Sequence, residues 1–289
     1  MPAGSCFVQN LRPAILRYDS AVQVRFWGVR GSVPWASASA MGYGCNTPCL
    51  EVTDAGTPGL LILDAGSGCV GLGRETIARK RPVSILLSHY HWDHIQGLPH
   101  FAPFFTPGWS VDLRAPRLGT LDEGWIHRIF GPPHFPLSLG ELPSPPRLSI
   151  VGLGGFELGG FAIEACSLTH PGGAFAYRIK GASGDLVYAT DHELGSVEAD
   201  VALAAFALNA AVLVLDAQLT PEEESRYAGY GHSSWRRCAE FASSCGAGHL
   251  WLFHHQPGRR DQELTDIERA ARRVFPATSV AREGAAFTI

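Results

Sequence analysis

The sequence predicts an α/β protein built as a four-layer αββα sandwich. Continuous apolar runs that end in Gly or Asp, a pattern typical of buried strands, occur in both halves of the chain. In each half, helical patterns follow such strands, so helices can cover the outer faces of two packed sheets. These two observations together favour a sheet-on-sheet core with helices on both sides.

The expected strands are short apolar runs or period-two alternations bounded by turn residues. They span 22–27, 50–53, 59–64, 83–88, 148–152, 161–168, 174–180, 185–190, 209–215 and 249–253. Helical periodicity predicts helices over 70–80, 121–130, 233–245 and 261–274. Residues 93–105 begin with a helical pattern, which Pro99 and Pro103 then interrupt.

Length and composition indicate one domain over residues 1–289. The chain has 289 residues, of which 46% are hydrophobic and 17% charged, which suits a folded core rather than disorder. Its 33 Gly and 20 Pro predict many loops. A Pro- and Gly-rich insert at about 106–150 is the least regular stretch, and we expect it to cover a site as a lid or wall.

Charge and apolar runs limit the partners that the sequence predicts. The net charge is −4, Lys80 and Lys180 are the only lysines, and no basic face stands out, which argues against long nucleic acid as a partner. No apolar run reaches 18 residues, and Met1–Ser20 lacks a signal-peptide pattern, so we expect no membrane span and a cytoplasmic protein.

The cysteines predict reduced thiols rather than disulfides. There are seven, an odd number, and no Cys-x-x-Cys pair occurs. Cys45 and Cys49 could grip a structural metal only with two further ligands, which the sequence does not identify.

A dense group of metal-binding residue types follows the strand at 83–88. The segment Ser88–His94 reads Ser-His-Tyr-His-Trp-Asp-His. His89 and His91 are two residues apart and project to one side of an extended backbone, and Asp93 and His94 follow where a helix begins. Four potential ligands within six residues predict a preformed metal site. The alternative is a polar loop that is rich in histidine by accident.

This loop and three further motifs resemble the metallo-β-lactamase-fold hydrolases. His-x-His-x-Asp-His after a strand is the hallmark of that fold. The segments Phe26–Ser32, Tyr43–Thr47 and Leu63–Gly66 are similar to the branch that holds ribonuclease Z, the phosphoribosyl cyclic phosphate phosphodiesterases and bacterial cyclic-nucleotide phosphodiesterases. Cys45 stands where that branch usually has Gly.

The resemblance implies a dinuclear metal site. It adds His170, Asp191 and His254, each at the end of an expected strand. By this analogy one ion is held by His89, His91 and His170, the other by Asp93, His94 and His254, and Asp191 bridges both. Because all seven ligands offer N or O, the resemblance implies two divalent ions, with Zn²⁺ preferred and Mn²⁺ or Fe also permitted.

Neighbouring polar residues receive supporting roles. Asp64 resembles the buried acid of the family, which orients ligands through hydrogen bonds. His255 points away from His254 if the strand continues, so we place it outside the ligand set.

A second pair of motifs indicates acid catalysis. Asp216 ends an apolar strand, and His232 precedes an expected helix. They resemble the two ribonuclease Z motifs that supply an acid and a proton-donating histidine, although ribonuclease Z has Glu where Asp216 stands. Helix capping by His232 or Ser233 is the structural alternative.

The sequence therefore predicts a dinuclear phosphodiesterase acting on a small-molecule, cyclic phosphodiester such as a 3′,5′-cyclic nucleotide. A hydroxide held between the ions would attack, with His232, Asp216 and Asp93 as catalytic residues. A tRNA 3′-processing endonuclease is the first alternative, and a non-phosphoester hydrolase of the same fold is the second. A metal-binding protein without activity is disfavoured because every expected ligand is present.

Two residues are candidate walls of the substrate pocket. Arg30 lies in the Gly-x-Arg-Gly-Ser loop and His134 in the insert. Arg30 could equally be a structural ion-pair partner. Relatives of this branch are often homodimers, so the resemblance also implies a homodimer.

Overall fold

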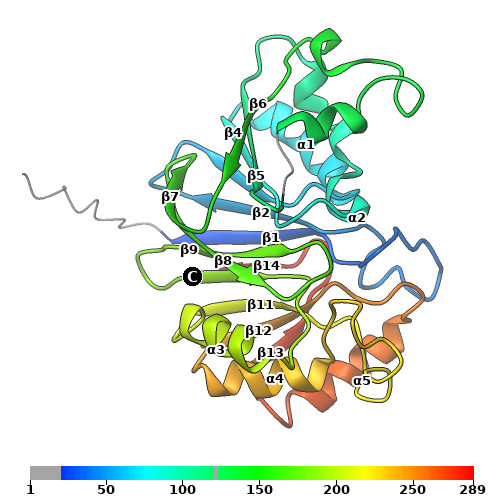
Figure 1. Cartoon of the computed structure of the whole chain (residues 1–289), viewed down its shortest axis with the longest axis vertical. Helices are drawn as coiled ribbons and strands as arrows, with labels where there is room; N and C mark the ends of the chain where they lie inside the picture. Colours follow the sequence, from blue (N-terminus) through cyan, green and yellow to red (C-terminus); the bar gives the residue numbers. More distant parts are fainter. Residues whose placement is uncertain (1–20, 120–122) are drawn as a thin grey trace, which may run out of the picture.

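Two seven-stranded sheets form the centre of the protein (Figure 1). The computed structural model describes residues 21–119 and 123–289. The first sheet has the order β14 (Ala286–Thr288), β1 (Val22–Gly28), β2 (Cys49–Asp54), β3 (Leu60–Leu63), β4 (Val83–Leu86), β5 (Val111–Pro116) and β6 (Arg147–Val151). The second has the order β13 (Thr278–Val280), β12 (His249–Phe253), β11 (Val212–Asp216), β10 (Leu186–Ala189), β9 (Ala174–Ile179), β8 (Phe161–Leu168) and β7 (Gly154–Leu158).

Each sheet joins an antiparallel part to a parallel part. In the first sheet, β14, β1, β2 and β3 pair antiparallel, whereas β3 to β6 pair parallel. In the second sheet, β7 to β10 pair antiparallel and β10 to β13 pair parallel. The parallel strands β3, β4, β10, β11 and β12 therefore end at the edge of their sheet where their following loops can meet.

Helices pack on the outer face of each sheet (Figure 1). They are α1 (Gly68–Arg79), α2 (Trp92–Ile95), α3 (Val197–Phe206), α4 (Trp235–Ser244) and α5 (Asp261–Ala271). α1 contacts the first sheet, and α3, α4 and α5 contact the second. Short 3₁₀ turns occupy Leu98–His100, Ala102–Phe105, Glu123–Arg128 and Leu139–Glu141.

Three apolar clusters fill the spaces between these layers. The central one, between the two sheets, contains Phe26, Tyr177 and Phe253, all fully buried. A second cluster lies between the second sheet and its helices, and a third lies between the first sheet, α1 and the 3₁₀ turns. The predicted four-layer αββα sandwich is confirmed.

Several elements differ from the sequence expectation. β5, β7, β13, β14 and α3 were not predicted. The expected helix at 93–105 is the single turn of α2 followed by two 3₁₀ turns, because Pro99 and Pro103 cannot donate helical hydrogen bonds. The expected helix at 121–130 is a 3₁₀ turn where it is described, and residues 121–122 lie outside the described residues.

The stretch at 106–150 is partly sheet. β5 and β6 lie within it and extend the first sheet. Near the metal-binding loop its Trp125 ring lies 5.0 Å from that of Tyr90, whose hydroxyl donates a 2.6 Å hydrogen bond to the Pro116 carbonyl. Among the described helices, none is both long enough and apolar enough to cross a bilayer.

Candidate metal centre

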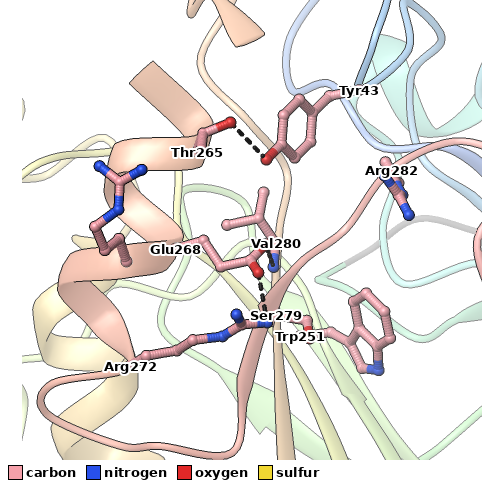
Figure 2. Close-up of a pocket in the computed structure, with 9 residues that line it drawn as sticks. Tyr43, Trp251, Thr265, Glu268, Arg272, Ser279, Val280 and Arg282 are labelled. Atoms are coloured by element: carbon pink, nitrogen blue, oxygen red, sulfur yellow. Dashed lines mark hydrogen bonds and ion pairs between the residues drawn. The ribbon is translucent and has the colours of Figure 1, made fainter. Parts of the chain in front are cut away.

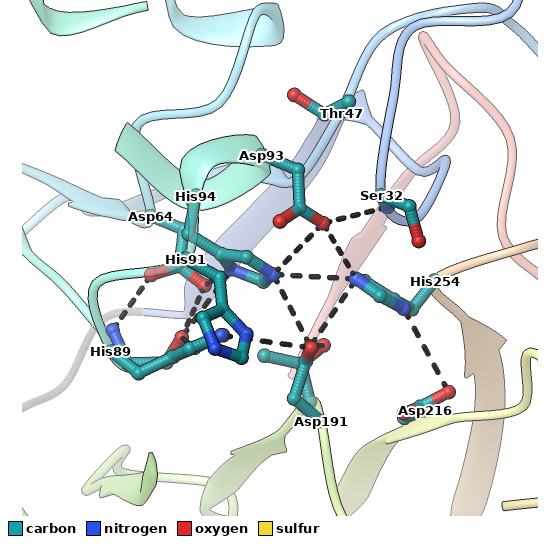
Figure 3. A network of polar contacts seen from close by, with 12 residues as sticks. Ser32, Thr47, Asp64, His89, His91, Asp93, His94, Asp191, Asp216 and His254 are labelled. Atoms are coloured by element: carbon teal, nitrogen blue, oxygen red, sulfur yellow. Dashed lines mark hydrogen bonds and ion pairs between the residues drawn. The ribbon is translucent and has the colours of Figure 1, made fainter. Parts of the chain in front are cut away.

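The loops after four strands bring the predicted ligands together (Figure 3). The loop after β4 carries the contiguous segment His89–His94, and single residues follow β8, β10 and β12. These single residues are His170, Asp191 and His254. Because the strands end at one edge, residues up to 161 positions apart in sequence come into direct contact.

One group of donor atoms, here called the first half-site, comprises His89, His91 and His170. His170 Nε2 lies 2.9 Å from His91 Nδ1. Asp191 Oδ2 lies 3.7 Å from His89 Nε2 and 3.6 Å from His170 Nε2. The four ligand atoms lie within 4.8 Å of one another, which is the spread a single ion can span.

The second half-site comprises Asp93, His94 and His254. His254 Nε2 lies 3.1 Å from Asp93 Oδ2 and 3.3 Å from His94 Nε2. Asp191 Oδ1 lies 3.2 Å from His94 Nε2 and 3.3 Å from His254 Nε2. The two oxygens of Asp191 thus face different half-sites, the arrangement required of a bridging carboxylate.

The donor set fits divalent metal ions. His89 Nε2 is buried and has no hydrogen-bond partner among the described residues, although it points into the cluster. A buried nitrogen without a partner is costly unless an ion accepts its lone pair. Imidazole and carboxylate ligands suit Zn²⁺ and other first-row divalent ions.

Outer hydrogen bonds fix which imidazole nitrogen faces the ions. His170 Nδ1 donates to the Gly231 carbonyl at 3.0 Å, and His94 Nδ1 donates to Asp64 Oδ2 at 2.8 Å. Each proton is thereby placed on Nδ1, so the lone pair of Nε2 points into the cluster.

Asp64 supports the second half-site through its hydrogen bond with His94. Its carboxylate accepts hydrogen bonds from the Ser88 N–H, the Ser88 hydroxyl and the Tyr188 hydroxyl at 2.7, 2.8 and 2.7 Å, in addition to the bond from His94. Asp64 is fully buried and does not join the ligand set. Its position is that expected of an orienting acid.

Burial and charge set the protonation of the cluster. Burial lowers the pKa of His89, His91 and His170, which favours the neutral imidazole that binds metal. Burial alone would lower the pKa of His94, but the surrounding carboxylates raise it well above its ordinary value. This excess of negative charge around one buried imidazole favours a bound cation.

Three site residues have left-handed backbones. The φ angles of Asp64, Asp191 and His254 are 59°, 57° and 60°. This conformation is uncommon for residues other than Gly, Asn or Asp, and it concentrates at functional sites. Each of these turns directs a side chain off the end of its strand toward the cluster.

The predicted acid–histidine pair lies beside the cluster. His232 Nδ1 donates a 2.6 Å hydrogen bond to Asp216 Oδ2, whose other oxygen accepts from the Gln218 N–H at 2.9 Å. The His232 ring centroid lies 5.2 Å from that of His254 and 5.5 Å from that of His170. Burial alone would lower the pKa of His232, but the charge and hydrogen bond of Asp216 raise it to about 9.

Arg30 is not a wall of the pocket, contrary to that expectation. It is fully buried, and its guanidinium donates to the carbonyls of Gly44, Arg259 and Ala40 at 2.8, 2.7 and 3.0 Å. Three of its N–H groups are bonded to backbone carbonyls inside the protein, so Arg30 holds together the loop at 29–48.

The other singled-out residues fall in different places. His134 is exposed in a turn of the stretch at 106–150, and its role in binding substrate stays a prediction. His255 is buried, and its Nε2 donates to the Ala281 carbonyl at 2.7 Å, outside the ligand set. Neither Cys45 nor Cys49 belongs to a metal-sized group of ligands in the part of the chain that the structure describes.

Two contacts were missed from the sequence. The Ser32 N–H donates to Asp93 Oδ2 at 2.7 Å, and the Ser32 hydroxyl accepts from Gln218 at 3.2 Å. Ser32 has a φ of 60°, which no sequence pattern indicates. Its place directly after Gly31 in the quoted motif is the feature that could have drawn attention to it.

A separate pocket of about 470 Å³ lies between α5 and β13 (Figure 2). Tyr43 and Thr265 hydrogen-bond across its rim at 3.2 Å, and Glu268 pairs with Arg272 at 2.5 Å. None of the predicted metal ligands lines it, so it is distinct from the candidate centre.

Comparison with known proteins gives the family. The family model described as the Beta-lactamase superfamily domain matches residues 61–255. A ribonuclease Z from Bradyrhizobium sp. is 25% identical, over 86% of this chain and 95% of the relative. A ribonuclease Z from Gemmatimonas aurantiaca is 39% identical over a shorter stretch, in which the chain spans 25% of the relative's length.

Solved structures share the fold. The metallo-beta-lactamase fold protein YhfI from Bacillus subtilis has a TM-score of 0.69 and 19% identity, covering 93% of this chain and all of that one. A diphosphatase of the PhnP family has a TM-score of 0.66 and 19% identity, covering 92% and 97%. With the αββα layers and the histidine and aspartate cluster described above, these matches show that the chain belongs to the β-lactamase superfamily and has the metallo-β-lactamase fold.

Proposed function

We propose that this protein is a metal-dependent phosphodiesterase with two divalent ions. The observation that carries the proposal is the position of the His232–Asp216 pair, whose imidazole lies beside both half-sites. A ligand cluster next to a hydrogen-bonded acid–histidine pair suits hydrolysis in which a poor leaving group needs a proton. The relatives named ribonuclease Z agree with a phosphodiester substrate.

In this proposal one set of residues binds the ions and another donates the proton. The first half-site, the second half-site and Asp191 would hold the ions, which when bound would activate water and neutralise charge on the phosphoryl group. Asp216 holds the Nδ1 proton of His232, so the other ring nitrogen is free to donate a proton to the departing oxygen. Zn²⁺ is our preferred ion for this nitrogen-rich set, with Mn²⁺ or Fe as alternatives.

We further propose that the substrate is a small, cyclic phosphodiester, such as a 3′,5′-cyclic nucleotide. The support is the charge of the stretch at 106–150, whose sequence contains four arginines and four acids. The arginines are Arg114, Arg117, Arg128 and Arg147, and the acids are Asp112, Asp122, Glu123 and Glu141. A stretch without net charge offers little attraction for a long polyanion.

Cleavage of RNA is the second candidate function. The expectation that long nucleic acid is excluded is not supported, because a sequence relative that matches over 86% of this chain and 95% of its own length is named ribonuclease Z. The homodimer and the pocket role of His134 stay predictions under either candidate.

A turnover panel separates the two candidates. It contains cyclic AMP, cyclic GMP, a cyclic pyrimidine nucleotide, a ribose 1,2-cyclic phosphate, bis(p-nitrophenyl) phosphate, precursor tRNA and a β-lactam. Our proposal expects turnover of one or more small diesters far above that of precursor tRNA. Accurate cleavage of precursor tRNA at its 3′ end with weak small-diester activity would instead establish the second candidate.

The variant His232→Ala tests the proton donor. It should keep both ions and lose about 10²–10⁴-fold activity on diesters with alkoxide leaving groups. The loss on bis(p-nitrophenyl) phosphate should be much smaller, because p-nitrophenolate leaves without a proton. Equal losses on both substrates, or loss of metal, would mean that His232 is not the proton donor.

A further inference from the structure

A short segment after β10 contacts both loops that complete the centre. His192 Nδ1 accepts a hydrogen bond from the Thr169 N–H at 3.0 Å, and the Glu193 N–H donates to the Thr169 carbonyl at 2.9 Å. The Leu194 N–H donates to the Ser233 hydroxyl at 2.9 Å. The segment that directly follows the bridging ligand therefore holds the loops of His170 and His232.

Within this segment the carboxylate of Glu193 makes an unusual set of contacts. It accepts the N–H of Gly229 at 2.8 and 3.0 Å and the N–H of Gly231 at 2.8 Å. Among the described residues, no Arg, Lys or His forms an ion pair with it, so its charge is met by these backbone donors. Hydrogen bonds to an ionised carboxylate are roughly twice as strong as neutral ones.

The loop with Gly229 and Gly231, here called the glycine loop, contacts His170 and leads directly into His232. Gly229 and Gly231 have φ angles of 85° and 87°, a region that other residues rarely adopt. A Cβ on Gly231 would come within 2.1 Å of His170 Nδ1, so the backbone passes against that ligand. The Gly231 carbonyl accepts the His170 proton, and His232 is the next residue.

Glu193 also lies at the edge of the candidate metal centre, next to His232. Glu193 and His232 line the same pocket of about 250 Å³. Gly229 is exposed, so without the carboxylate its N–H would face water and the loop would lose this tie to the protein. No other described side chain accepts from both glycine amides.

We propose that Glu193 is a positioning residue that holds His170 and His232 in register with the bridging ligand. Glu193 is separated from Asp191 by one residue in sequence. Its side chain accepts hydrogen bonds from the loop that carries the proposed proton donor, His232. The role of His232 in this inference rests on the proposed function, whereas the tie between Glu193 and the glycine loop does not.

Hydrogen–deuterium exchange of the full chain tests the tie without any assay of activity. In Glu193→Ala, the amides of residues 225–232 should exchange about 10-fold faster or more, since bonds to a charged acceptor are lost. Glu193→Gln keeps one acceptor oxygen and should give a smaller increase. Glu198→Gln, an exposed acid on α3 that undergoes the same charge change, is the matched control and should leave the loop unchanged. Unchanged exchange in Glu193→Ala would overturn the proposal.

Kinetics then test positioning. Glu193→Gln, loaded with both ions, should lower kcat on an alkoxide-leaving diester about 10-fold with little change in KM, and lower kcat on bis(p-nitrophenyl) phosphate much less. Equal losses on the two substrates, despite faster exchange, would overturn the role toward His232. If the unmodified protein hydrolyses no diester, the proposed function fails. Hydrogen–deuterium exchange and Zn²⁺ titration of the variants still decide whether Glu193 holds the glycine loop and His170.

Discussion

The two half-sites share the Asp191 carboxylate, whose two oxygens face one half-site each, but they differ in their surroundings. In the second half-site all three side chains are buried, Asp64 orients His94, and the Ser32 N–H fixes Asp93. In the first half-site His91 is exposed, and no described hydrogen bond to its other ring nitrogen fixes it. The second half-site is thus closed and preorganised, whereas the first is open to solvent. We therefore expect the first half-site to exchange its ion faster.

The largest effect should follow loss of the shared ligand. In Asp191→Ala both half-sites lose a carboxylate oxygen, so we expect the metal content to fall below that of any other single ligand variant. The loss of affinity should exceed the about 10–100-fold typical of outer partners. Elemental analysis after gel filtration measures it. If Asp191→Ala retains two ions per chain, the carboxylate does not bridge.

A second pair of variants sharpens the contrast between the half-sites. His94→Ala should remove the second ion and also lower the thermal midpoint of unfolding, because Asp64 then loses a buried partner. His91→Ala should weaken the first ion while leaving the fold as stable as before, because His91 is exposed. Stepwise chelation with a metal-sensitive dye, followed by thermal unfolding, compares them. Equal unfolding midpoints for the two variants would contradict the contrast.

A smaller effect is expected from the orienting acid. Asp64→Asn replaces one acceptor oxygen by an NH₂ group, which at the Oδ2 position would face the hydroxyl donors of Ser88 and Tyr188. Affinity of the second half-site should fall about 10–100-fold, and that of the first half-site less. Zn²⁺ titration in the presence of a competing chelator resolves the two ions. A loss confined to the first half-site would be the opposite of this expectation.

The smallest effect concerns pH. Burial lowers the pKa of His255 to about 3, below the ordinary value of about 6.5. The unfolded state therefore binds more protons between these values, and the stability due to neutral His255 is lost as pH falls below about 6.5. The loss is up to about 1.4 kcal/mol per pH unit.

Urea unfolding of metal-free protein at several pH values measures this dependence. His255→Gln keeps a donor for the Ala281 carbonyl. In this variant the free energy of unfolding should decrease less steeply as the pH falls, by a slope that corresponds to up to one bound proton. Identical slopes would assign the pH dependence to other groups.

The contiguous parts of the fold and site could be predicted from sequence. The run at 59–64 ends in Asp64, and the segment at 89–94 follows a buried strand, so pattern alone placed those side chains at strand ends. The strands β13 and β14 were missed because each has three residues, too few to show a period. α3 was missed because it is apolar nearly all round and shows no polar face.

Distant partners limited the rest of the prediction. The ligands predicted after β8, β10 and β12 came from the family resemblance, since a lone His or Asp at a strand end carries no local pattern. Arg30 was assigned wrongly because its three carbonyl acceptors include one that lies 229 residues away. Glu193 was overlooked for the same reason, since its glycine partners lie 36 and 38 residues along the chain. The expectation of a single domain stays a prediction.

The order of the strands has a consequence for synthesis on the ribosome. His94 and His254 are 160 residues apart, and among the described residues the edge of β1 that faces away from β2 pairs with β14, near residue 289. At roughly 5–20 residues per second, about 10–30 s separate the appearance of the first ligands from that of the last. During that interval the nascent chain carries a histidine cluster without its partners and an unpaired strand edge. A chain halted before β12 therefore cannot complete the second half-site, and its β1 lacks the β14 partner.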